Sequence, residues 1–129
     1  MGEILKQKPV LLIAAVTSRY PAALDWTIEK TTAAWGEVAL RSSVFDFTET
    51  DFYTESMGTD LKKQFIVFDR LLDPSELPPK KIQSNRWEVE YSEHAQSEEI
   101  RPLNIDPGYI SEAKLVLATT KDRDHRIYL

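Results

Sequence analysis

The sequence predicts a single α+β domain over residues 1–129, in which helices cover one face of an antiparallel sheet. Three observations predict this class: an apolar run long enough for a buried strand, two segments with apolar residues at helical spacing, and β-branched runs between and after them. A chain of 129 residues is long enough to bury a substantial core in one domain.

The first predicted elements are a strand and a helix. Residues 10–16 are continuously apolar, which is typical of a central strand covered on both faces. A helix is predicted over residues 22–35, because Pro21 suits a first helical turn and Gly36 suits the position after a helix end. The stripe at three-to-four spacing consists of Leu24, Ile28, Thr31 or Thr32, and Trp35.

The middle of the chain predicts two strands and a second helix. The strands are expected over residues 38–47, with an irregularity near Ser42, and over residues 61–72, with an acidic interruption between them. The helix is expected over residues 80–92. Its buried side is predicted to be Ile82, Trp87 and Tyr91.

The C-terminal part predicts further strands. A short strand is expected over residues 100–105, followed by a turn at residues 106–108, because Asp-Pro-Gly favours turns. A helical turn at residues 110–113 and strands at 114–120 and 126–129 complete the prediction. The first six elements have the order β-α-β-β-α-β, which is that of a ferredoxin-like sheet with two helices, here extended by C-terminal β-hairpin strands.

Composition narrows the functional classes. The net charge of −5 argues against broad nucleic-acid binding, which depends on phosphate neutralisation. The C-terminal block from residue 101 nevertheless has a balance of +1, against −6 for residues 1–100. No apolar run reaches membrane-spanning length, and the chain has no cysteine for disulfides or thiolate metal sites. We expect a cytoplasmic protein.

A dense polar cluster near the C-terminus is the first candidate site. Lys121 and Arg126 could hold a phosphate or carboxylate, Thr120 could add a hydroxyl donor, and His125 could act as a general acid or base near neutral pH. The same residues are also compatible with a solvated hairpin turn, because charge runs are usually solvated faces.

Asn104 and Asp106 are two residues apart and are therefore expected on the same side of a strand. They could bind a ligand hydroxyl or a hard metal ion, and Asp106 joins His125 as a candidate catalytic residue. In the alternative interpretation, Asp106 only binds the backbone of its own turn.

The segment from Val44 to Asp60 carries five acids and no base. Asp46 and Asp51 are candidate ligands for a divalent ion such as Mg²⁺, which prefers oxygen donors. An ordinary solvated acidic loop explains the same residues.

Several segments together resemble an uncharacterised prokaryotic family, domain of unknown function family 4416. The C-terminal segments are residues 103–110, 115–122 and 125–129, and the upstream ones are residues 45–48 and 50–53 with Met57-Gly58. Ser56 stands where the family usually has Glu. The resemblance implies that members continue past residue 129 into a further β segment, so we expect this chain to be truncated. It implies no reaction.

The leading functional hypothesis is a polar site at the end of the sheet that binds a small anionic or phosphate-bearing ligand, such as a nucleotide or an RNA end. The alternative is a non-enzymatic interaction or regulatory module, in which the apolar residues 127–129 form an exposed edge strand that pairs with another chain, for example in a homodimer. Whether the protein is an enzyme stays open at this point.

Overall fold

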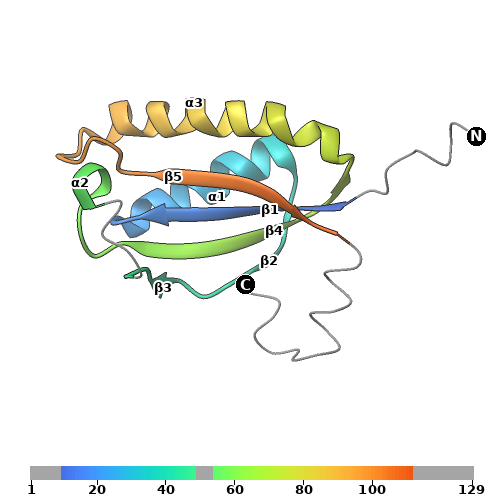
Figure 1. The fold of residues 1–129 in the computed structure, drawn as a ribbon, viewed down its shortest axis with the longest axis horizontal. Helices are drawn as coiled ribbons and strands as arrows, with labels where there is room; N and C mark the ends of the chain where they lie inside the picture. The colour runs from blue at the N-terminus through green and yellow to red at the C-terminus, as the bar shows by residue number, and fades with distance from the viewer. Residues whose placement is uncertain (1–9, 49–53, 112–129) are drawn as a thin grey trace, which may run out of the picture.

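The computed structural model describes residues 10–48 and 54–111, which form a mixed α+β structure around one antiparallel sheet of five strands (Figure 1). The predicted α+β class is therefore confirmed. The elements in chain order are β1 (Val10–Ser18), α1 (Pro21–Trp35), β2 (Val38–Arg41), β3 (Phe45–Asp46), α2 (Thr54–Met57), β4 (Lys62–Leu72), α3 (Leu77–Ala95) and β5 (Asn104–Ile110).

The sheet is built around β1, which lies between β4 and β5 and is antiparallel to both. The strand order is β2-β4-β1-β5, and β3 also pairs with β4 beyond the bend that follows β2. The predicted irregularity near Ser42 is this bend, and one predicted strand is therefore two short ones. α1 packs over β1 and β4, and α3 packs over β5, on the same side of the sheet (Figure 1).

α1 shows how local sequence sets the ends of an element. Pro21 occupies the first turn, where its missing N–H costs no hydrogen bond. Gly36 ends the helix with φ +116°, a conformation that residues with a Cβ rarely adopt. The buried Thr27 and Thr31 donate their hydroxyls to the carbonyls of Ala23 and Thr27, at 2.8 and 2.7 Å, so both of these buried hydroxyls have a partner.

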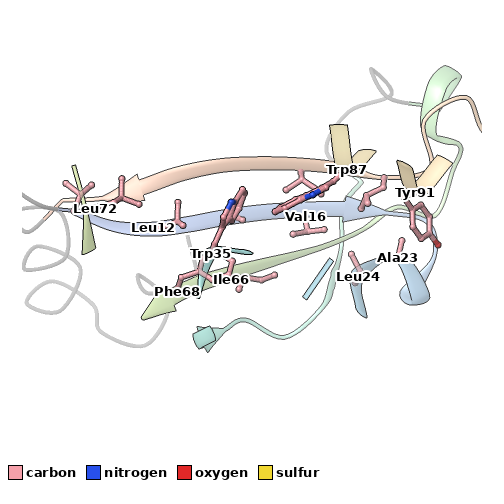
Figure 2. Close-up of a cluster of buried hydrophobic side chains, with 14 residues drawn as sticks. Leu12, Val16, Ala23, Leu24, Trp35, Ile66, Phe68, Leu72, Trp87 and Tyr91 are labelled. Carbon is pink, nitrogen blue, oxygen red and sulfur yellow. The ribbon is translucent and has the colours of Figure 1, made fainter. Parts of the chain in front are cut away.

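The core lies between the two long helices and the sheet (Figure 2). Trp35 of α1 is almost fully buried and meets Phe68 of β4 edge to face and Trp87 of α3 at a tilt, with centroid distances of 5.7 and 4.9 Å. Its indole N–H donates to Gln83 Oε1 at 2.8 Å, which satisfies the one polar group of the ring. Trp35 therefore joins both helices to the sheet, as expected for a core residue.

The structure corrects the predicted buried side of the second helix. α3 begins at Leu77, directly after a 3₁₀ turn in which Asp73 and Glu76 cap each other's backbone N–H groups. Ile82 is 56% exposed, so its prediction as a core residue was wrong. The buried stripe is instead Lys80, Ser84, Trp87 and Tyr91. Two of its four positions are polar, and an apolar pattern cannot identify them.

The predicted turn at residues 106–108 was also wrong, because Asp106, Pro107 and Gly108 lie inside β5 and pair with β1. Ile105 directs its N–H and C=O away from β1, towards Glu88 and Lys81 of α3. This direction alternates along a strand, so Pro107 also faces outward and its missing N–H breaks no bond to β1.

The remaining predictions concern the acidic segment and the C-terminal part of the chain. The strands predicted at residues 114–120 and 126–129 lie outside the described residues, and residue 110 is the last residue of β5 rather than the start of a helical turn. The short helix α2 lies in the acidic segment, where the sequence predicted no element. Within residues 10–48 and 54–111, no helix has the length and apolar character needed to cross a membrane.

Two isoleucines provide a matched test of this packing. Ile66 of β4 is fully buried, whereas Ile82 of α3 is 56% exposed. Ile66→Ala should lower the free energy of unfolding by about 2–5 kcal/mol, because it removes buried methyl groups and leaves a cavity. Ile82→Ala should change it by less than about 0.5 kcal/mol. Urea denaturation followed by circular dichroism would measure both, and equal losses would contradict the assigned orientation of α3.

Candidate functional site

The face of the sheet opposite the helices carries a row of side chains near one end of the strands. Strand pairing places Phe45 of β3 beside Lys63 of β4, Lys63 beside Thr17 of β1, and Thr17 beside Asn104 of β5. We call these four residues the Lys63 row. Their neighbours along the strands, such as Val16 and Ile105, point into the core, so the alternation of a strand directs the row to the opposite face.

Aromatic rings surround the ammonium group of Lys63. Its Nζ lies 4.0 Å from the centroid of the Phe47 ring and 6.0 Å from that of Phe65. The rings of Phe45 and Phe65 stack with a centroid distance of 5.9 Å and an interplanar angle of 24°. Phe45 is 38% exposed, so one of its surfaces is open to solvent. The result is a cation beside an accessible aromatic surface.

The β5 end of the row is a hydrogen-bonded chain of polar groups. Asn104 and Asp106 lie on the same side of β5, and the Asn104 Nδ2 donates to Asp106 Oδ2 at 3.0 Å. Arg101 Nη2 donates to Asn104 Oδ1 at 2.6 Å, and Lys81 Nζ donates to Asp106 Oδ1 at 2.8 Å. Burial alone would raise the pKa of Asp106, but the bonds from Lys81 and Asn104 outweigh it and hold that pKa below its ordinary value.

Glu88 of α3 joins this chain to the backbone of the sheet. Its Oε2 accepts the outward N–H of Ile105 at 2.7 Å, and its Oε1 lies 3.8 Å from Arg101 Nη2. Only 14% of the Glu88 side chain is exposed. Burial raises the pKa of the Glu88 carboxyl above its ordinary value, although the Ile105 bond and Arg101 offset part of the effect. The side chains of α3 therefore cover the edge of β5 at Ile105.

The Met57-Gly58 pair fixes the segment next to the row. Met57 is fully buried, and Gly58 has φ +88°. A Cβ at Gly58 would lie 3.2 Å from the Cγ and Oε2 of Glu99, whose carboxylate accepts the Tyr20 hydroxyl and lies 3.6 Å from Arg19 Nη1. The pair of residues thus has a structural explanation that needs no ligand.

Only some of the predicted site residues lie within the described parts of the chain. Thr120, Lys121, His125, Arg126 and Asp51 lie outside the described residues, so their roles stay predictions. The roles of Asn104 and Asp106 also stay predictions, although both now have defined partners. In residues 10–48 and 54–111, no group of three or more His, Asp or Glu side chains is placed to hold a metal ion. Asp46 instead forms an ion pair with Lys62, with Nζ 2.5 Å from Oδ1.

Several residues of the site were missed by sequence analysis. Lys63 and Phe45 are brought together by strand register, and Lys81 reaches Asp106 from a different element. The sequence feature that could have pointed to Lys63 is the Lys62-Lys63 pair, which lies between an acidic segment and an apolar strand. That signal does not say which face each lysine occupies.

A comparison with known protein families found a match that covers nearly the whole chain. The model of a family described as a domain of unknown function (DUF4416) matches residues 8–129. The chain belongs to this family. No curated protein and no solved structure matches the chain. Membership in the family therefore covers the whole described sheet, including the Lys63 row, and carries no statement about a ligand or a reaction.

Glu88 and Asp106 should affect the pH dependence of stability in opposite directions. The pKa of Glu88 is raised in the folded state, so its contribution is largest below its unfolded pKa of about 4.3 and is lost as pH rises through the folded pKa. Wild type should therefore lose stability relative to Glu88→Gln as pH rises through that range.

The pKa of Asp106 is lowered, so wild type should instead lose stability relative to Asp106→Asn as pH falls below about 3.9. Urea denaturation over a pH series would measure both differences. Slopes of the same sign for the two variants would contradict the described hydrogen bonds.

Gly58 and Gly108 form a second matched pair. Gly58→Ala should destabilise the protein by more than about 1 kcal/mol, because alanine at φ +88° is strained and its Cβ crowds Glu99. At Gly108 the nearest atom to an added Cβ is Ile13 Cγ2 at 3.6 Å, an ordinary contact, so Gly108→Ala should be neutral or stabilising. Thermal unfolding monitored by circular dichroism would compare them. A stable Gly58→Ala variant would contradict this account of the motif.

Proposed function

We propose that this domain binds a small phosphate-bearing ligand, a nucleotide or an RNA end, at the Phe45 and Lys63 end of the Lys63 row, since Thr17 and Asn104 at its other end are buried. The observation that carries the proposal is the setting of Lys63. Lys62 and Lys81 pair with Asp46 and Asp106, whereas Lys63 makes no ion pair with any described residue and lies among aromatic rings. Its charge contributes to the lowered pKa of Asp106, but no described carboxylate forms an ion pair with it, so we infer that a ligand phosphate does.

The exposed surface of Phe45 supplies the second half of the recognition. A base stacked on an aromatic side chain gains about 1–3 kcal/mol and needs no particular sequence. Phe65 lies behind Phe45 and holds its ring in place. A phosphate beside Lys63 and a base on Phe45 together match one nucleotide. The net charge of −5 disfavours long polyanions, so the proposal is limited to mononucleotides and strand ends.

The catalytic and C-terminal assignments remain proposals from the sequence. β5 carries the chain away from the Lys63 row, since Ile110 pairs with Leu11 at the other end of β1. We retain Thr120, Lys121, His125 and Arg126 as candidate contacts to the phosphate, and Asp46 with Asp51 as candidate Mg²⁺ ligands. The proposal is one of binding, and it assigns no reaction. A cytoplasmic location is likewise proposed from the sequence.

We also propose that the topology is ferredoxin-like, with β2 and β3 together acting as the second strand. The order β2-β4-β1-β5, the antiparallel pairing of neighbours and the two long helices on one side support this. The alternative function, a non-enzymatic module that pairs through residues 127–129, lies outside the described residues. Within them, Glu88 and Lys81 occupy the outward groups of Ile105, which leaves less of β5 free for pairing.

Fluorescence anisotropy with a labelled, 5′-phosphorylated RNA tetranucleotide would test the proposal. We expect binding that weakens about tenfold in Phe45→Ala, through loss of stacking. Lys63→Ala should also weaken binding and reduce the slope of log K against log salt by about 0.7, the value for one phosphate contact on a single strand.

Lys30→Ala is the matched control, because Lys30 pairs with Glu90 on the helical side, and it should bind like wild type. A 5′-hydroxyl oligonucleotide should bind more weakly than the phosphorylated one. Equal binding by wild type, Phe45→Ala and Lys63→Ala would refute the proposal.

A further inference from the structure

A pocket of about 360 Å³ lies at the N-terminus of α1, between this helix and the bend that joins β2 to β3. Pro21 and Asp25 line it from the helix, Arg41 from the end of β2, Ser42 from the bend, and Gln64 from β4. Its volume is at the lower end of the range for small-molecule sites in proteins, roughly 300–1,000 Å³. The pocket is therefore large enough for a small organic molecule and not only for a single ion.

Gln64 leaves one hydrogen-bonding group in this pocket without a partner. The residue is only 6% exposed, and its Nε2 donates to the Ser42 carbonyl at 2.9 Å. Its Oε1 accepts no hydrogen bond from any residue that the structure describes. Buried polar groups are normally paired, because a group removed from water loses the bonds it had there. A ligand N–H in the pocket would provide the missing donor.

Two opposite charges line the same pocket, and neither forms an ion pair with a described residue. Arg41 and Asp25 are both exposed, and within residues 10–48 and 54–111 neither forms an ion pair. A guanidinium binds a carboxylate through two parallel hydrogen bonds.

We propose that this pocket binds a small zwitterion with a carboxylate and an ammonium group, of the size of a free amino acid or a dipeptide. Arg41 holds the carboxylate, and Asp25 and the Gln64 Oε1 hold the ammonium group. The pairing of charges decides the class of ligand. A phosphate dianion would meet Arg41 but would be repelled by Asp25, whereas a zwitterion satisfies both.

This site is separate from the Lys63 row and does not depend on it. Gln64 follows Lys63 directly in β4, so the two side chains lie on opposite faces of the sheet. Gln64 pairs with Val16, whose side chain belongs to the core, whereas Lys63 pairs with Thr17. A ligand at one position therefore has no direct contact with a ligand at the other.

The test is isothermal titration calorimetry of the full chain with the free amino acids, a set of dipeptides, and the des-amino carboxylic acid that matches each binder. At least one zwitterion should bind, and its des-amino analogue should bind at least about tenfold more weakly, since it lacks the group that Asp25 and Gln64 recognise. Amide chemical shifts in the nuclear magnetic resonance spectrum should change around Ser42 and Asp25.

Three variants locate the site. Arg41→Gln should weaken binding by at least about tenfold, through loss of the bidentate contact. Asp25→Asn should remove the preference for the zwitterion over its des-amino analogue, a result that general destabilisation would not produce. Arg86→Gln is the matched control, because Arg86 is an exposed arginine of α3, and it should bind like wild type. The proposal is overturned if no zwitterion binds, if Arg41→Gln binds unchanged, or if the preference persists in Asp25→Asn.

Discussion

The structure depends on the position of β1 between two antiparallel neighbours. Pairing with β4, with β5 or with both fixes each residue of this strand to one face of the sheet, although the register with β4 shifts between Leu11 and Ile13. Leu12, Ala14 and Val16 consequently belong to the buried core. Figure 2 shows Leu12 and Val16 in the same cluster as Trp35 and Trp87. A shift of one residue in this register would turn the whole apolar set towards solvent, so burial of one face also determines what lies on the other.

The same constraint sorts adjacent residues of β4 into two chemical environments. Lys63 faces away from the helices and lies among phenylalanine rings, and Gln64 faces the side of α1. A single strand thus serves two surfaces that have different charge. The face opposite the helices offers a cation beside an aromatic ring at Lys63 and Phe45, and the pocket beside α1 offers a cation and an anion together. The ligands proposed for the two surfaces differ in net charge, although the residues that would bind them are neighbours in the sequence.

The sequence was sufficient for features that depend on short stretches of chain. The apolar run at residues 10–16 is β1, and Pro21 and Gly36 mark the ends of α1. It was insufficient where distant residues decide the outcome. Asp106-Pro107-Gly108 is a good turn sequence, yet pairing with β1 makes it a strand. The buried face of α3 includes Lys80 and Ser84, and the Lys63 row joins four strands by register. Local hydropathy predicts neither the buried face of α3 nor the Lys63 row. The predicted site residues from 112 onward lie outside the described structure.

The outer side of β5 has a consequence for self-association. Intermolecular β-sheet growth needs a continuous series of free N–H and C=O groups along an edge. On β5 the outward groups of Ile105 are occupied by Glu88 and Lys81, and Pro107 has no N–H to donate. Between Asn104 and Ile110, Tyr109 is left as the one outward position with an intact donor that no described residue occupies. The arrangement that joins α3 to the sheet therefore also limits fibril-like stacking of one molecule on another along this edge.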